Sequence, residues 1–213
     1  MSGMRNTSIE NGIETKQQHH LSLPNNSKNL IQNSKEMTHQ INTSEARVYV
    51  GTYAKYNDGS IFGEWLTLSD YTDKEEFYDA CRELHEDEED PEFMFQDYEN
   101  IPNGLIGESW ISDSIFEVLE ALEAMDESRQ EAFLIWCDNG HRKLSEGDID
   151  DLISDFDDDY IGEYKDEEDF AYEQVEQMDL PEFAKTYFDY EAYARDLFSG
   201  DYWSNSGHVF YNS

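Results

Sequence analysis

Apolar and polar residues alternate over residues 47–54 and 61–67, on either side of Asp58-Gly59. A period of two is typical of strands with one buried face, and a tight turn between strands requires the positive φ that glycine adopts readily. The pattern therefore predicts two antiparallel strands joined at Asp58-Gly59. The segment "PEFMFQDYE", which begins at Pro91, predicts a third strand.

A helical period separates the second and third of these strands. Thr72 and Glu75 form a capping-box pattern, which is typical of a helix start. The apolar positions that follow on one helical face are Phe77, Ala80, Cys81 and Leu84. We expect a helix near residues 73–86 and, with the strands, a small αβ unit that ends at about residue 107.

Residues 110–156 show a helical period throughout. Helix starts are predicted where a serine precedes an acid by three residues, at Ser114 and Ser128, and a third helix is expected to open at Ser145. The expected buried positions are Ile115, Val118, Leu119, Leu122 and Met125 in the first helix, Phe133, Leu134 and Trp136 in the second, and Ile149, Leu152, Ile153 and Phe156 in the third.

The last part of the chain contains both strand and helix patterns. A short strand is predicted at 160–164, with helices over 166–178 and 189–199. Two aromatic runs on either side of residues 205–207, Asn-Ser-Gly, predict a second hairpin.

These elements predict an α+β fold class, with three small domains after a polar tail. Residues 1–46 contain no Phe, Tyr or Trp and cannot bury enough apolar surface to offset the entropy of ordering them, so we expect a disordered N-terminal tail. The expected domains are an N-terminal αβ domain at 47–107, a central helical domain at 108–153 and a C-terminal αβ domain with an antiparallel hairpin at 154–213.

The charge of the chain changes this picture most. The chain has 50 acidic and 14 basic side chains, a formal charge of −36, and all of that excess lies after residue 46. Such a surface repels nucleic acid and anionic membranes and attracts basic partners. At the line density of B-DNA, one charge per roughly 1.7 Å, this charge corresponds to about 61 Å of duplex, whereas a compact domain of this size is about 40 Å across. An elongated molecule is therefore expected.

The sequence offers little for catalysis. Cys81 and Cys137 form neither a CxxC motif nor a metal-ligand pair, so we interpret both as core thiols. His85, His141 and His208 lie in no HExxH arrangement, and phosphate-binding loops and GxSxG elbows are missing from the sequence. No apolar run of about 18 residues and no signal peptide is present, so we expect a cytoplasmic protein. We assign no enzyme activity, catalytic residue or cofactor.

The acidic segment "DFDDDYIGEYKDEED", residues 155–169, is the best candidate for a metal site. In one register of an EF-hand loop Tyr160 stands where the loop requires glycine, and in the other Ile161 occupies a ligand position. We therefore assign no metal ligand. Three alternatives stay open: an acidic calcium-binding protein, a nonspecific acidic chaperone-like protein and a surface adapted to high salt.

Four separated stretches favour another interpretation. "RVYVGTYAKYNDGSIFGEWLTL", "MFQDYENIP", "FDYEAYARDL" and "HVFYNS", in this order from Arg47 to the C-terminus, resemble the signature stretches of the ArdA family of antirestriction proteins. The resemblance implies a non-enzymatic inhibitor from conjugative elements, a dimer of elongated three-domain subunits. Its carboxylates would mimic DNA phosphates in the cleft of type I restriction–modification enzymes, chiefly the specificity and methyltransferase subunits, and so protect incoming DNA.

If this is so, the functional site is a surface, and no single acid in it is indispensable. The acids that we expect to form this DNA-mimic surface are Glu86, Asp87, Glu88, Glu89, Asp90, Asp148, Asp150, Asp151, Asp155, Asp157, Asp158, Asp159, Glu163, Asp166, Glu167, Glu168 and Asp169.

Overall fold

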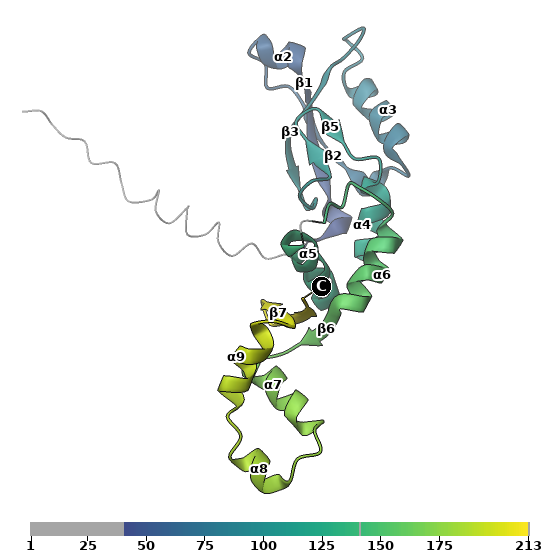
Figure 1. Cartoon of the computed structure of the whole chain (residues 1–213). Helices are drawn as coiled ribbons and strands as arrows, with labels where there is room; N and C mark the ends of the chain where they lie inside the picture. Colours follow the sequence, from purple (N-terminus) through teal and green to yellow (C-terminus); the bar gives the residue numbers. More distant parts are fainter. Residues whose placement is uncertain (1–40, 141, 213) are drawn as a thin grey trace, which may run out of the picture. The chain divides into compact units, whose positions relative to one another are not determined.

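The computed structural model describes residues 41–140 and 142–212 (Figure 1). In these ranges the chain combines helices with three small antiparallel sheets, which confirms the mixed helical and sheet fold class. The predicted tail lies outside the described residues except for its last six, 41–46.

The first sheet has the strand order β2-β1-β3 and is antiparallel throughout. Its strands are β1 (Arg47–Thr52), β2 (Glu64–Thr67) and β3 (Phe93–Glu99). Val48 in β1 lies opposite Leu66 on one side and Tyr98 on the other, and the β1–β3 register shifts after Tyr49. All three strands expected from the sequence are present.

The connection from β1 to β2 is not the tight turn that was predicted at Asp58-Gly59. A short helix, α2 (Tyr53–Asn57), begins directly after β1 because the Thr52 hydroxyl accepts a hydrogen bond from the amide of Lys55 (3.3 Å). Gly59 does adopt a positive φ of 80°, but the turn there follows a helix.

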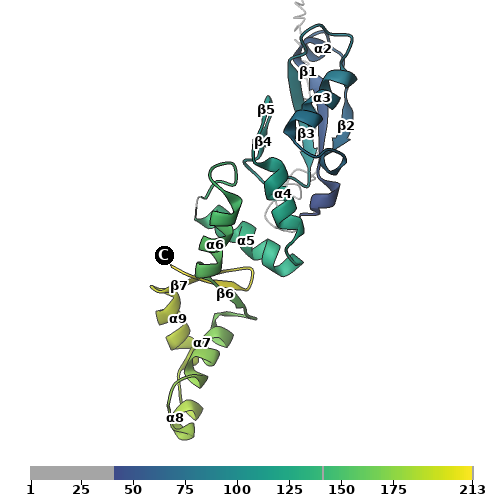
Figure 2. The ribbon, with the colours of Figure 1, turned by 90° about the vertical axis from the view of Figure 1, so that its right-hand side faces the viewer.

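Helix α3 (Lys74–Leu84) covers one face of this sheet (Figures 1 and 2). The apolar positions that the sequence places on its inner face include Phe77 and Cys81, which are fully buried. The ring of Phe77 lies 6.0 Å from that of Phe95 on β3. The helix is therefore held by aromatic packing beneath an acidic outer face.

The middle of the chain is helical, as predicted. It contains the short strands β4 (Ile106–Gly107) and β5 (Trp110–Ile111) and the helices α4 (Ile115–Glu123), α5 (Glu127–Asn139) and α6 (Ile149–Asp159). The predicted apolar stripe of α4 is buried, with Met125 partly so. Helix α6 begins later than Ser145, because Gly147 takes a φ of 87° and the Asp148 carboxylate caps the helix by accepting from Asp150 N (2.8 Å).

The last part of the chain ends in a sheet with the order β6-β8-β7. The elements of this last part of the chain are β6 (Tyr160–Glu163), α7 (Glu167–Glu176), α8 (Glu182–Thr186), α9 (Tyr190–Phe198), β7 (Tyr202–Asn205) and β8 (His208–Tyr211). The predicted hairpin is confirmed: Ser206 and Gly207 both take positive φ, and a Cβ at Gly207 would lie 2.9 Å from the carbonyl oxygen of Tyr164. Helix α8 was not predicted.

A column of aromatic rings links the helical part to this sheet. We define the aromatic column as Phe133, Trp136, Phe156, Tyr160 and Phe210. Phe156 is fully buried, and its ring lies 5.0–6.5 Å from the other four. The domain boundary expected at residues 153 and 154 falls within α6, and the three-domain division stays a prediction.

Residues 41–46, which the sequence assigned to the tail, belong to the fold. The amide of Ile41 donates to the side-chain oxygen of Gln130 (3.1 Å), and the carbonyl oxygen of Ala46 accepts from the amide of Leu68 (2.8 Å). Ala46 is fully buried and the 3-10 helix η2 (Thr43–Glu45) precedes it. Residues 41–46 contain no aromatic residue, and their composition gave no indication of these contacts.

Candidate acidic interaction surface

Helix α6 carries carboxylates on the side opposite its buried residues. Asp151, Asp155 and Asp158 are spaced i, i+4 and i+7, so they share one face, and all three are exposed. The inward side is anchored by Phe156, which is part of the aromatic column. The apolar face fixes the direction of the acidic one. The first five residues of the segment that failed as a calcium loop, 155–159, are therefore the end of an amphipathic helix, and the rest of that segment forms β6 and the start of α7.

Two further acids of α6 have partners in the chain. Asp157 forms an ion pair with Arg129. Asp159 accepts hydrogen bonds from Trp136 Nε1 (2.9 Å) and from Arg142 (3.2 Å), and its side chain is largely covered. These acids fix α6 against α5 and the segment after it.

The acids at the end of α6 oppose the helix dipole. The C-terminus of a helix carries partial negative charge, so bases stabilise it and acids destabilise it. The last turn of α6 holds Asp157, Asp158 and Asp159 and no basic residue. Asp157 and Asp159 are offset by their partners, whereas the charge of Asp158, unpaired in the described part of the chain, costs stability there, which favours an explanation of this acid by function.

The turn after α3 holds the acids Glu86–Asp90 around a lysine. Lys55 Nζ lies 2.7 Å from Asp87 Oδ1, 3.4 Å from Glu88 Oε1 and 3.0 Å from Nδ1 of the buried His85. Glu88 also accepts a hydrogen bond from the Thr52 hydroxyl (2.7 Å). The hydrogen bond from Lys55 lowers the pKa of Asp87. Sequence reasoning missed Lys55, which lies 30 or more residues from its partners.

The same group is the one cluster of potential metal ligands in residues 41–140 and 142–212. The ligand atoms of His85, Asp87 and Glu88 lie within 4.8 Å of one another. The ammonium of Lys55 sits among them and stacks over the Phe62 ring at 4.6 Å. The lysine thus already supplies the positive charge that a cation would bring, and we assign no metal here.

The third acidic group spans Glu163–Asp169 at the start of α7. Asp166 caps the helix by accepting from the amide of Asp169 (2.9 Å), and this bond, with that from Lys165, lowers the pKa of Asp166. Glu163 accepts from Ser128 Oγ (2.7 Å). Unlike the acids in the last turn of α6, Asp166 and the first-turn acids of α7 lie at a helix N-terminus, where the dipole favours them.

The predicted acids therefore divide into two sets. Those with a hydrogen-bond or ion-pair partner are Asp87, Glu88, Asp148, Asp157, Asp159, Glu163, Asp166 and Glu167. Those whose carboxylates have no such partner in the described part of the chain, and are exposed, are Glu86, Glu89, Asp90, Asp150, Asp151, Asp155, Asp158, Glu168 and Asp169. We call the second set the open carboxylates.

The described histidines and cysteines have structural positions. His85 and His208 are buried, and burial lowers the pKa of each. Cys81 and Cys137 are buried free thiols, as expected, and burial raises the pKa of each to about 12. His141 lies outside the described residues. These groups are therefore neutral at pH 7 and covered by protein.

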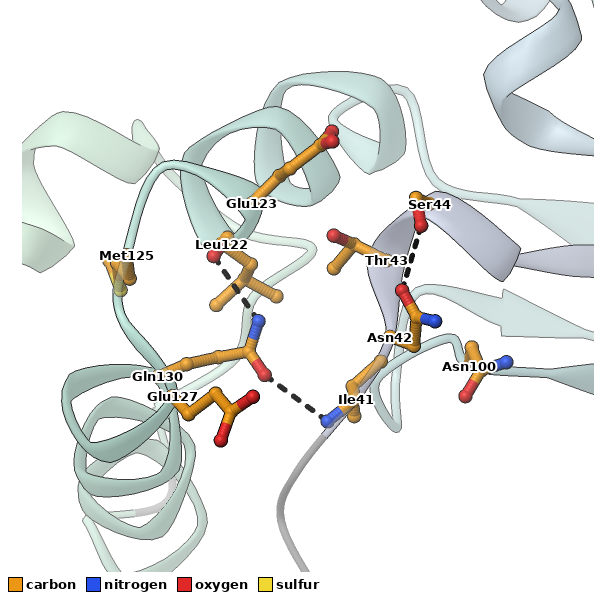
Figure 3. Close-up of a pocket in the computed structure, with 10 residues that line it drawn as sticks. All are labelled: Ile41, Asn42, Thr43, Ser44, Asn100, Leu122, Glu123, Met125, Glu127 and Gln130. Carbon is orange, nitrogen blue, oxygen red and sulfur yellow. Dashed lines mark hydrogen bonds between the residues drawn. The ribbon is translucent and has the colours of Figure 1, made fainter.

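A hollow of about 510 Å³ lies beside η2 (Figure 3). Its lining residues are Ile41, Asn42, Thr43, Ser44, Asn100, Leu122, Glu123, Met125, Glu127 and Gln130. The Gln130 side chain bridges it, donating to the carbonyl oxygen of Leu122 (3.2 Å) and accepting from the amide of Ile41. This lining includes no histidine, cysteine, lysine or arginine, so it provides no acid–base pair and no cation for an anion, and we assign it no ligand.

The helices between residues 41 and 212 are all too short or too polar to cross a bilayer.

The fold and this surface define a strongly acidic protein of helices and antiparallel sheets. The family model of the antirestriction protein (ArdA) matches residues 48–210. The chain belongs to this family of antirestriction proteins, as the resemblance of its four stretches implied. No curated protein matches the sequence.

Proposed function

We propose that the protein mimics B-form DNA with its surface carboxylates and competes with DNA for the binding cleft of type I restriction–modification enzymes. The partners in this proposal are the specificity and methyltransferase subunits, and the result is protection of incoming mobile DNA in the cytoplasm. Membership of the antirestriction family supports a role against restriction, and the acidic surface supports DNA mimicry as its mechanism. No catalytic step and no cofactor are part of this proposal.

The face of α6 is the observation that carries the proposal. Asp151, Asp155 and Asp158 are open carboxylates that span about 10.5 Å of helix axis, at a rise of about 1.5 Å per residue. One strand of B-DNA presents a phosphate about every 3.4 Å of axis, so the two line densities agree within a factor of about two. Basic side chains placed to neutralise phosphates attract such an array by the same Coulomb forces.

The paired acids have a different part in the proposal. Asp157, Asp159 and Glu88 hold α6 and the turn after α3 in place through their bonds to Arg129, Trp136 and Thr52. A fixed array meets its partner with less loss of conformational entropy than a mobile one, which strengthens binding. We therefore propose that the open carboxylates make most of the contacts and that the paired ones set their positions.

A competition experiment tests the proposal. A purified type I methyltransferase with labelled target duplex is titrated with the full chain at several salt concentrations. We expect displacement of DNA at near-stoichiometric amounts, with an affinity that falls as salt rises because ionic contacts are screened. Failure to displace DNA at every salt concentration contradicts the proposal.

Two controls separate the alternatives. A nonspecific acidic chaperone-like protein would bind histone-like basic proteins as tightly as the methyltransferase, so equal affinity for both supports that alternative. A calcium-binding protein would give saturable binding of Ca²⁺ that Mg²⁺ does not compete away, measured by calorimetry on the same sample. The homodimer is also part of the proposal, and sedimentation of the purified protein tests it.

A further inference from the structure

In and beside helix α8 the usual pattern of burial is reversed: aromatic side chains are exposed and a lysine side chain is covered. Phe183 is 71% exposed and Tyr187, which ends the helix, is 86% exposed, whereas the side chain of Lys185 between them is only 12% exposed. Folded proteins normally bury aromatic rings and leave lysine ammonium groups in water. This reversed order requires an explanation, and it is also why the sequence gave no amphipathic signal for α8.

The inward orientation of Lys185 is fixed by several contacts. Its Nζ donates to the carboxylate of Glu176 (3.2 Å) and to the carbonyl oxygen of the same residue (3.4 Å) at the end of α7. Its own carbonyl oxygen accepts from the Tyr190 hydroxyl (3.2 Å), and the Tyr190 ring lies 5.0 Å from that of Tyr172. These bonds hold one side of α8 in the connection between α7 and α9 (Figure 1).

Phe183 and Tyr187 therefore face solvent together. They are four residues apart, Phe183 within α8 and Tyr187 at its C-cap, and both side chains are exposed. Neither ring is among the aromatic contacts found in the described part of the chain, although the neighbouring Phe188 packs against Tyr193 at 5.5 Å. We call Phe183 and Tyr187 the aromatic pair.

The charges around the aromatic pair restrict its partner. The acids between residues 176 and 191 are all exposed: Glu176, Asp179, Glu182, Asp189 and Glu191. The segment has one base, Lys185, and Glu176 already binds it. An anionic membrane or a nucleic acid would be repelled. The complementary surface is an apolar pocket with lysine or arginine side chains around it.

We propose that the aromatic pair enters such a pocket in the base-modifying core of the restriction–modification enzyme. This inference rests on the proposed function and adds a specific contact to it. Enzymes that modify a base in DNA turn it out of the duplex and hold it between aromatic or apolar side chains. A flat ring flanked by carboxylates presents the same combination of ring and negative charge as an extruded base between its phosphates.

The test measures binding of the full chain to the purified methyltransferase. The double variant Phe183→Ala/Tyr187→Ala is expected to bind roughly tenfold or more weakly, because buried aromatic side chains often dominate interface affinity. The loss should be the same at low and high salt, since an apolar contact is not screened. Tyr187→Phe keeps the ring and should bind like the wild type, and so should Tyr56→Ala, which removes an exposed ring on α2.

Three outcomes would overturn the inference. If the wild type binds and the double variant binds equally well, the aromatic pair is not an anchor while the proposed function stands. If the double variant is a monomer where the wild type is a dimer, a second copy of the chain covers the pair. If the wild type neither binds the methyltransferase nor displaces DNA, the proposed function fails and this inference fails with it. Unchanged thermal melting of the variant shows that it is folded.

Discussion

The carboxylate of Asp159 accepts a hydrogen bond from the indole Nε1 of Trp136 at 2.9 Å. Arg142 lies over the same indole ring, with its guanidinium carbon 3.6 Å from the ring centroid, and donates to Asp159. This acid therefore faces the core, whereas Asp158 next to it is exposed. Neighbouring acids in one run thus have different roles.

Replacing Asp159 and Asp158 by alanine, one at a time, should distinguish an acid that stabilises the fold from one that only adds surface charge. Asp159→Ala leaves the indole N–H and Arg142 without this acceptor, and we expect it to lower the free energy of unfolding by about 1–3 kcal/mol. Asp158→Ala removes the same charge from the surface and should change the free energy of unfolding by less than about 0.5 kcal/mol. Urea denaturation of both variants measures this, and equal effects contradict the assignment.

The aromatic column should be sensitive to truncation. Phe156→Ala removes a fully buried ring that touches four others, and an unfilled cavity of this kind costs about 3–5 kcal/mol of unfolding free energy. Phe183→Ala deletes an equal ring from the surface and should leave thermal melting almost unchanged. A mild effect at Phe156 would show that the column is not a rigid part of the core.

Neutralising the open carboxylates should weaken inhibition only in groups. Each exposed charge contributes well under about 1 kcal/mol at physiological salt, so any one of Asp151→Asn, Asp155→Asn and Asp158→Asn should change the DNA displacement constant by less than about threefold. The triple variant should weaken it by roughly tenfold, since three such losses add. A single change that abolishes displacement in a folded variant would contradict a distributed surface.

The free energy of unfolding should fall as the pH drops through 6.5, the usual pKa of histidine. Burial lowers the pKa of His85 and His208 below the usual 6.5, so the unfolded chain binds protons first as the pH falls. Their contribution is present above pH 6.5 and is lost as the pH drops toward the lowered values. Urea denaturation across this range measures it, and a His208→Gln variant, which does not titrate there, should show a smaller slope. A slope that is unchanged excludes His208 as a contributor.

Two N-terminal deletions should differ in stability. Removal of residues 1–36 should leave DNA displacement and thermal melting unchanged. Removal of residues 1–46 also deletes the buried Ala46 and the bond from Ile41 to Gln130, and should lower the free energy of unfolding by about 1–3 kcal/mol. Equal melting of the two would show that residues 41–46 do not stabilise the fold.

The sequence predicted most elements where local signals were strong. The alternation of residues 47–54 predicted a strand, which is present over Arg47–Thr52, while residues 53 and 54 begin α2. The apolar stripe of α4 predicted one buried face, and it was confirmed. Capping was predicted less accurately: Asp73, not Thr72, caps α3, while Thr72 donates to Glu76. Several acids and hydroxyls in a row can serve as caps, and the backbone conformation of the structure selects one of them.

The candidate site was predicted in outline only. Acid runs are visible in a sequence, but whether a carboxylate is open depends on bases brought close by the fold. Lys55 reaches Asp87 across 32 residues and Arg129 reaches Asp157 across 28. No local pattern reports such pairs, so the open carboxylates could not be separated from the paired ones before the structure was known.

The aromatic column has a consequence for how such sequences diverge. Because α6 and β8 share the buried rings of Phe156 and Phe210, a substitution in either must suit the other, and accepted changes there should occur as compensating pairs. Asp and Glu can exchange on the open surface without such compensation. Relatives of this chain should therefore keep the spacing of the rings long after their individual acids have been replaced.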